Sequence, residues 1–507
     1  MDYEKQLSET SQEASSLEGN LVDVSKPSLL SRVSRALYLD ELFKNAENRG
    51  IERIPDEEKT DDSLWNAGSM WFGSNMVVPT FSIGVLGVTL FGLTFWPAFL
   101  VIIFFNILGS LAPAYFSTFG PYFGLRQIIM SRYWFGFFGV RVCAIFNIIA
   151  CVGWTTVNTI VAAQLLHTVN HGQLPSWAGI LIIIVLSFLV TIFGYKIVHA
   201  FEKWSWVPNT IIFLITAIQM GRSHTFTYGH MSTGRLEAGQ VLSFGATVYG
   251  FATGWTSYAS DYTVYMPKDI PRRKVFLVVL GGINFPLMLA MILGAACATG
   301  TTTSEHFRTN YAETGIGGLF NAILVDDSLH GFGQFCMVVL SISTVSNNVP
   351  NLYTLGFSAQ TLWSKFQKIP RIVWSTIASG AALGIAIPAY LYFDQVMENF
   401  MNIIGYWLAI YTSIGISEHL IYQGSFKAYD FEAYDDPSRL PVGITALFAF
   451  ACGIAGAVVG MSQTWWVGPI AKLVSPGFGD VGFELAFGFS FVAYNLTRPF
   501  EKKYFKR

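Results

Sequence analysis

The sequence predicts an all-α polytopic membrane protein with about twelve transmembrane helices, and three observations support this fold class. Only 13% of the 507 residues are charged, against about 25% in an ordinary globular chain. Many apolar runs reach the roughly 20 residues that a helix needs to cross the hydrocarbon core. Glycine and proline interrupt two of these runs at corresponding places, which is typical of transporters built from two inverted repeats.

The apolar runs divide the chain into expected spans and domains. Runs that qualify by length and composition lie near residues 66–92, 93–118, 136–166, 177–194, 205–221, 241–262, 275–298, 331–357, 372–393, 400–420, 441–461 and 480–496. We expect a cytoplasmic, largely disordered N-terminal tail over 1–64 and two inverted five-helix repeats forming the transport core over 65–420. Two additional transmembrane helices over 421–496 and a cytoplasmic C-terminal tail over 497–507 would follow.

The basic residues predict that both chain ends lie in the cytoplasm. If the N-terminal tail is cytoplasmic, the connections on its side hold most of the Lys and Arg, as the positive-inside rule requires. These residues are Arg126, Arg132, Lys196, Lys203, Lys268, Arg272, Arg273, Lys274, Lys365, Lys368, Arg371, Lys427 and Arg439, with Lys502, Lys503, Lys506 and Arg507 in the C-terminal tail. A net charge of −2, with basic residues spread over separate loops, argues against a nucleic-acid partner. The lipid bilayer is the expected surrounding, and the tail's lysines and serines are candidate sites for ubiquitin or phosphate signals.

Two spans carry the breaks. The first contains "WFGSNMVVPTFSIGVLG" (71–87) and the sixth "SFGATVYGFATGWTSYASDY" (243–262). Gly and Pro weaken the hydrogen-bond ladder, which is tolerated at membrane depth only beside a cavity or a packed neighbour. The alternative is close helix packing through small residues. Because the first and sixth spans start consecutive blocks of five, the second block must be inverted, and we expect a binding site where both helices unwind.

Polar and aromatic residues predict what this site binds. Asn347 and Asn351 are four residues apart and share one face of the eighth span. Trp154 and Asn158 are spaced in the same way in the third span, and Trp255 lies in the Gly-rich sixth span. Indoles stack on flat rings, and each carboxamide offers a donor and an acceptor to a ring edge. The set therefore suits a flat, uncharged heterocycle.

A structural interpretation of the same residues stays open. Intramembrane Asn often bonds one helix to another, and Asn348, about 100° away around its helix, is expected to do so. An enzyme would need a nucleophile with its base, or a cluster of His, Asp and Glu, inside the spans, and the sequence offers none. A channel would need a repeated ring of pore-lining residues. A transporter is therefore favoured.

Four motifs identify a family. They are "RGIERIPDEEKTDDSLWNAGSMWFGSNMVVPTFSIGVLG" (49–87), "GWTTVN" (153–158), "GFATGWTSYASDYTVYMP" (250–267) and "SNNVPNLYTLGFSAQ" (346–360). In these motifs the chain resembles the nucleobase–cation symporter-1 family, specifically the fungal purine–cytosine permeases. The resemblance implies a LeuT-type fold and a plasma-membrane importer of cytosine, adenine, guanine and hypoxanthine. The alternative is a carrier of the same family for pyridoxine-like vitamins, uracil or allantoin.

The resemblance also implies roles for single residues. Trp154 and Trp255 would sandwich the base, Asn158, Asn347 and Asn351 would bond its edge, and Thr80 and Ser82 would add contacts from the first span. Sodium-coupled relatives have two neighbouring hydroxyl residues just before the first of the paired asparagines, where this chain has Val345 and Ser346. A hard cation needs several oxygen ligands, so we expect proton coupling and no cofactor or metal. Coupling-ion candidates are Ser346, Asp261 and Glu418, with Glu484 as a further intramembrane carboxylate.

Overall fold

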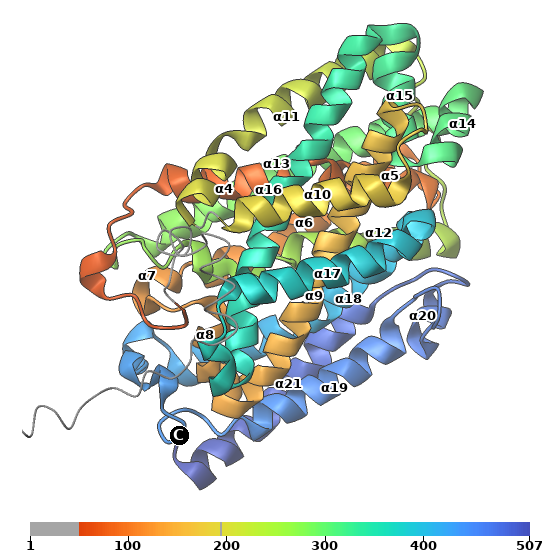
Figure 1. The fold of residues 1–507 in the computed structure, drawn as a ribbon. Helices are drawn as coiled ribbons and strands as arrows, with labels where there is room; N and C mark the ends of the chain where they lie inside the picture. Colours follow the sequence, from red (N-terminus) through yellow and green to blue (C-terminus); the bar gives the residue numbers. More distant parts are fainter. Residues whose placement is uncertain (1–49, 193–194) are drawn as a thin grey trace, which may run out of the picture. The chain divides into compact units, whose positions relative to one another are not determined.

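A computed structural model describes residues 50–192 and 195–507, and these residues are largely helical. Each expected span corresponds to one helix or to one broken pair. In order, they are α4 (Leu64–Asn75) with α5 (Val78–Thr89), α6 (Phe95–Ser117), α9 (Arg132–Val169), α10 (Ser176–Ile192), α11 (Tyr195–Ser223), α12 (Arg235–Thr253), α13 (Arg272–Thr303), α16 (Gly331–Leu362), α17 (Arg371–Ala389), α18 (Phe393–Ser417), α19 (Ile444–Gly460) and α21 (Gly482–Phe505). The predicted polytopic helical fold is confirmed (Figure 1).

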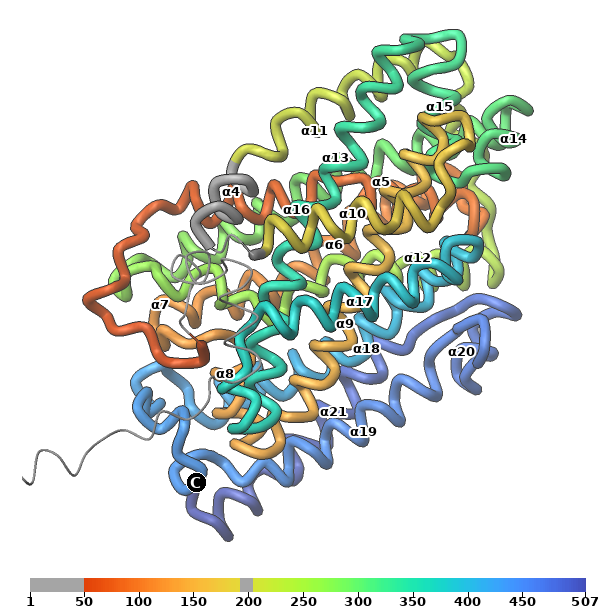
Figure 2. The backbone as a smooth tube through the Cα atoms, viewed as in Figure 1, coloured from red at the N-terminus to blue at the C-terminus, as the bar shows by residue number. Residues whose placement is uncertain are grey.

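Short helices occupy the connections. They are α7 (Gly120–Phe123), α8 (Gln127–Met130), α14 (Glu305–Thr314), α15 (Ile316–Leu324) and α20 (Pro469–Val474). The described chain starts, and the C terminus lies, at the end of the helix bundle that also holds α7 and α8 (Figure 2). Most of the predicted N-terminal tail, with its candidate modification sites, lies outside the described residues.

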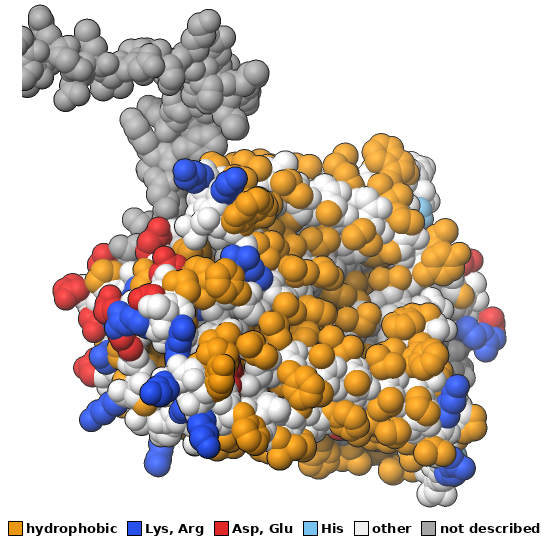
Figure 3. Space-filling model, turned by 90° about the horizontal axis from the view of Figure 1, so that it is seen from below, with side chains coloured by type: hydrophobic (Ala, Val, Ile, Leu, Met, Phe, Trp, Pro, Cys, Tyr) orange, Lys and Arg blue, Asp and Glu red, His pale blue; other side chains and the backbone are white. Residues whose placement is uncertain are grey.

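The outer surface is apolar between two polar ends. Figure 3 shows a broad hydrophobic face with Lys, Arg, Asp and Glu gathered mainly at one end. Large apolar side chains such as Phe104, Ile149, Leu214 and Val492 are exposed on different helices, which only lipid explains at this scale. Four stretches of the described chain are long and apolar enough to cross a membrane, at 95–123, 132–169, 272–303 and 371–423, and the bent pair α4–α5 adds a fifth. The 371–423 stretch contains both α17 and α18.

Contacts between helices show an internal repeat of five spans. When spans one to five are exchanged with spans six to ten, each of five helix pairs in contact becomes another pair in contact: α5–α13 becomes α12–α6, α4–α11 becomes α12–α18, α9–α10 becomes α16–α17, α10–α16 becomes α17–α9, and α11–α16 becomes α18–α9. The long helices α9 and α16 run antiparallel, since α9 starts beside α8 and ends at α15, whereas α16 starts near α15 and ends beside α8 (Figure 1). The core is therefore an inverted repeat of two five-helix units, with α19 and α21 packed outside it against α18.

Both predicted breaks occur. The axes of α4 and α5 differ by 52°, because Val77 is extended (φ −139°, ψ 162°) and Pro79 cannot donate to the ladder. In the sixth span α12 stops at Thr253, and a 3₁₀ helix, η2 (Thr256–Tyr262), continues it. The glycines serve mainly for packing, as the alternative interpretation held. A Cβ on Gly84 would lie 1.8 Å from the Met291 carbonyl oxygen, so the two backbones touch.

Candidate substrate site

The break in the first span exposes backbone carbonyls, and side chains from three helices satisfy them. The carbonyl oxygens of Ser74, Asn75 and Met76 accept hydrogen bonds from Asn347 Nδ2 at 2.6 Å, Thr80 Oγ1 at 2.7 Å and Asn209 Nδ2 at 2.9 Å. An unpaired carbonyl at membrane depth would cost several kcal/mol. Asn347 and Thr80, predicted as base contacts, therefore also hold the broken helix in shape.

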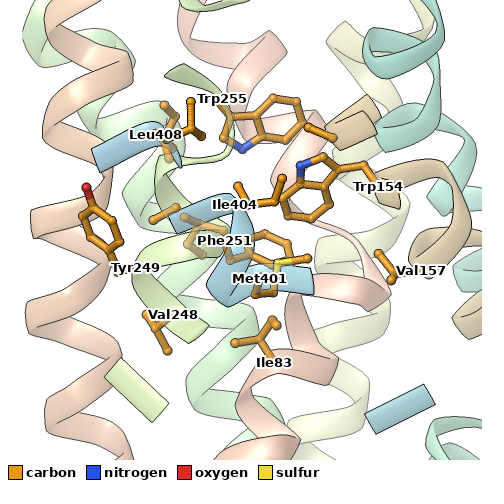
Figure 4. Packing of buried hydrophobic residues seen from close by; sticks show 14 of the residues in the cluster. Ile83, Trp154, Val157, Val248, Tyr249, Phe251, Trp255, Met401, Ile404 and Leu408 are labelled. Atoms are coloured by element: carbon orange, nitrogen blue, oxygen red, sulfur yellow. The ribbon is translucent and has the colours of Figure 1, made fainter. Parts of the chain in front are cut away.

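Two indoles form facing walls beside this break. Trp154 on α9 and Trp255, between α12 and η2, lie nearly parallel, with ring centroids 6.4 Å apart and planes 16° from each other (Figure 4). Phe251 and Phe400 pack edge-on against Trp154, at 4.9 and 5.6 Å between centroids. Both indoles are buried, and Trp154 Nε1 has no hydrogen-bond partner among residues 50–192 and 195–507. The predicted pairing of these two tryptophans is present.

The predicted carboxamides gather next to the indoles. Asn158 Nδ2 donates to Asn347 Oδ1 at 2.7 Å and to Asn348 Oδ1 at 3.0 Å. Its own Oδ1 is buried and finds no donor within the described part of the chain. Asn351 Nδ2 donates to the Asn347 carbonyl at 2.7 Å, and Tyr258 OH donates to Asn351 Oδ1 at 2.9 Å. Within the described part of the chain, the site therefore presents an acceptor, Asn158 Oδ1, and a donor, Trp154 Nε1, that are both without protein partners.

Asn348 and two hydroxyls have local partners. Asn348 Nδ2 donates to Ser187 Oγ on α10 at 3.1 Å, which matches its expected role between helices. Ser82 Oγ donates to the Val78 carbonyl at 3.0 Å, and Ser346 Oγ donates to the Ser343 carbonyl at 2.6 Å. Both serines are buried. Each donates its proton within its own helix, so only a hydroxyl oxygen is left to offer to a ligand.

The candidate carboxylates lie in separate networks. Asp261 Oδ1 accepts a hydrogen bond from the backbone N–H of Gln127 at 2.7 Å, and Arg126 Nη1 donates to the backbone carbonyl of Asp261 at 2.8 Å. Glu418 binds the Arg498 guanidinium through two hydrogen bonds of 2.8 Å each. Both carboxylates are buried and paired, which fits structural roles.

Sequence reasoning missed the buried acids Glu398 and Asp480, the half-buried Asp394, and Asn75, whose Oδ1 accepts a hydrogen bond from Trp255 Nε1. Asp394 and Glu398 lie near the start of α18, and Asp480 precedes α21. Asp480 accepts hydrogen bonds from Ser462 N at 2.7 Å and Gly482 N at 2.9 Å, whereas Glu484 Oε2 is buried with no donor among the described residues. The sequence signal that could have found these acids is a carboxylate at the edge of an apolar run. No group of three or more His, Cys, Asp or Glu that could hold a metal occurs in the described ranges.

Comparison with known proteins identifies the family of the chain. Residues 53–475 match the family model for permeases for cytosine/purines, uracil, thiamine and allantoin. The chain is 51% identical over 466 residues to the purine-cytosine permease FCY2 of Saccharomyces cerevisiae, covering 91% of this chain and 87% of the relative. It is 31% identical over 538 residues to the vitamin B6 transporter TPN1 of the same yeast, covering 95% and 93%.

A solved structure supports the fold. Mhp1, a nucleobase-cation-symport-1 family transporter in a closed conformation with bromovinylhydantoin bound, superposes with a TM-score of 0.63 at 12% identity, covering 90% of this chain and 95% of that one. At this identity the likeness concerns the fold alone, which is that of the predicted LeuT-type transporter. The relatives are permeases and not enzymes, in agreement with the prediction. The chain belongs to the family of membrane permeases for cytosine/purines, uracil, thiamine and allantoin.

Proposed function

We propose that this protein imports cytosine and the purine bases adenine, guanine and hypoxanthine across the plasma membrane, coupled to protons, with both termini cytoplasmic. The observation that carries the proposal is the pair of near-parallel indoles beside the free acceptor of Asn158. The 51% identity to a purine-cytosine permease, against 31% to a vitamin B6 transporter, favours nucleobases over pyridoxine-like vitamins.

The geometry suits a flat ring. A base between two indoles needs about 3.5 Å of separation on each face. The ring centroids are 6.4 Å apart, which is an upper limit on the gap between the two planes, so the walls must move apart to admit the ring. Stacking contributes roughly 1–3 kcal/mol per aromatic ring. These walls bind any planar ring, so they supply affinity rather than selectivity.

Selectivity would come from the ring edge. Asn158 Oδ1 is free to accept a hydrogen bond from an exocyclic amino group or a ring N–H of the base. Trp154 Nε1 is free to donate to a ligand acceptor. A ligand that leaves these groups unmet would bury them without partners, which is how a polar site rejects analogues.

Access would alternate through movement of the helices that break at the site. The α4–α5 and α12–η2 breaks place both pocket-lining segments at a joint, and the inverted repeat provides two equivalent halves. Proton coupling is supported by the missing hydroxyl at Val345. The tail is the proposed site of ubiquitin-dependent turnover.

Uptake of labelled cytosine by cells that lack their own carrier tests the proposal. Adenine, guanine and hypoxanthine should compete at low micromolar cytosine, and uracil, allantoin and pyridoxine should not. Uptake should rise as external pH falls and should not change when sodium is replaced by choline. Saturable uptake of pyridoxine or uracil instead, from protein shown to reach the surface, would overturn the substrate. Dependence on sodium would overturn the coupling.

A further inference from the structure

The two indole walls of the site are held in different ways. Trp154 packs against the edges of Phe251 and Phe400, and its N–H finds no acceptor among the described residues. The Trp255 N–H instead donates to Asn75 Oδ1 at 2.9 Å. We propose that Asn75 is a positioning residue of the base site, which sets the orientation of the Trp255 ring and ties this wall to the break in the first span.

Asn75 is the last residue of α4 and is fully buried. Its Nδ2 donates to the Trp71 carbonyl at 2.8 Å, and its own carbonyl accepts from Thr80 Oγ1 at 2.7 Å. The bond from Nδ2 to the Trp71 carbonyl fixes which way the carboxamide faces, and the Thr80 bond holds the Asn75 backbone. A flipped amide would set its NH₂ against the indole N–H and its oxygen against a carbonyl, losing both hydrogen bonds.

Neighbouring rings leave the indole little other freedom. Trp71 packs edge-on against Trp255 with centroids 5.3 Å apart, and Tyr258 does so at 5.6 Å. Edge contacts of this kind hold a ring's position but tolerate rotation of the indole about its Cβ–Cγ bond, which tilts the ring plane, whereas a hydrogen bond to Nε1 selects one orientation. Asn75 therefore selects the orientation in which the indole lies parallel to Trp154.

This bond also joins the two broken helices. Asn75 closes α4, and Trp255 lies in the link between α12 and η2. A movement of the chain at either break would therefore be transmitted to the other break through Trp255, the indole proposed to stack on the base. Removing Asn75 should therefore weaken base binding more than it slows turnover of the bound carrier.

Uptake kinetics of Asn75→Ala, Asn75→Asp, Trp255→Phe and the Asn75→Ala/Trp255→Phe double variant test this role. Asn75→Ala leaves a buried donor unpaired, and we expect the KM for cytosine to rise about 10–100-fold, with a much smaller change in maximal rate per surface carrier. Asn75→Asp retains an acceptor and should recover most of the loss. Asn106→Ala removes another buried carboxamide, bonded to Ile102 on α6, and should leave KM unchanged.

The double variant separates positioning from direct contact. Phenylalanine has no N–H, so Asn75→Ala should add no further rise in KM when Trp255 is already Phe. An equal rise in both backgrounds would overturn the proposal, because Asn75 would then contact the base itself. A fall in surface carrier or maximal rate with unchanged KM would overturn it too.

A spectroscopic readout keeps the test independent of the transport assay, since the kinetic arm rests on the proposed function. In the purified ¹⁵N-tryptophan-labelled protein, the indole N–H resonance missing from Trp255→Phe belongs to Trp255. Asn75→Ala should shift it and speed its hydrogen exchange, and Asn75→Asp should not speed the exchange. An unmoved resonance would refute the bond. Failure of the wild type to take up any base would refute the function, while this resonance still decides the role of Asn75.

Discussion

Replacing Asn158 by Ala tests the chemistry of the site most directly. The change removes the free Oδ1 and also the donor that serves Asn347 Oδ1 at 2.7 Å and Asn348 Oδ1 at 3.0 Å. Each buried group left without its partner costs about 1–3 kcal/mol. Two such groups give about 2–6 kcal/mol, and each 1.36 kcal/mol is tenfold, so the effect corresponds to a loss of about 30-fold to about 3 × 10⁴-fold in uptake. This agrees with the up to about 10⁴-fold discrimination that a hydrogen-bonding site achieves.

The assay is initial-rate uptake of labelled cytosine in cells without their own carrier, normalised to carrier at the surface. Asn106→Ala is the matched control, since it truncates a buried intramembrane Asn whose Nδ2 donates to the Ile102 carbonyl and to Met291 Sδ. Asn158→Asp keeps an acceptor and loses a donor, so it should fall between the wild type and the Ala variant. Normal uptake by Asn158→Ala at normal surface level would refute this account of the site.

Three further substitutions separate structural from functional roles. Asp261→Asn should lower uptake, because the carboxylate accepts a hydrogen bond from the backbone N–H of Gln127. Uptake by this variant should still rise as external pH falls. Uptake that no longer depends on pH would instead make Asp261 the proton carrier. Glu418→Gln breaks a buried ion pair with Arg498, which costs about 3–5 kcal/mol. It should lower the Tm of the purified carrier and its surface level without changing KM, and a raised KM at normal Tm would contradict this. Gly84→Ala places a Cβ 1.8 Å from a backbone carbonyl of α13 and should abolish folded carrier in size-exclusion chromatography, whereas Gly281→Ala, with no described atom within 4 Å of its Cβ, should not.

The sequence located the pocket residues because their spacing is a property of the helix itself. Trp154 and Asn158 are one turn apart, so they share a face whatever surrounds them. Helix periodicity does not say which partner each polar atom meets. Asn347 was expected at the base edge, and the structure shows in addition that its Nδ2 donates to the Ser74 carbonyl in the break of the first span. That carbonyl needs a partner only because the chain bends there.

Composition and apolar run length by themselves determined the membrane class and the spans, and the positions of Gly and Pro determined the two broken helices, because the bilayer sets length and polarity locally along the chain. Only the tertiary structure decided which partners the buried polar groups bond to. Asn75 gave no signal in the sequence, since its role depends on an indole 180 positions away. Glu418, a predicted coupling candidate, forms an ion pair with Arg498 from the last helix, and nothing in the linear sequence predicted this pair. Partners of buried polar groups depend on distances between helices, and the linear pattern of a chain does not contain those distances.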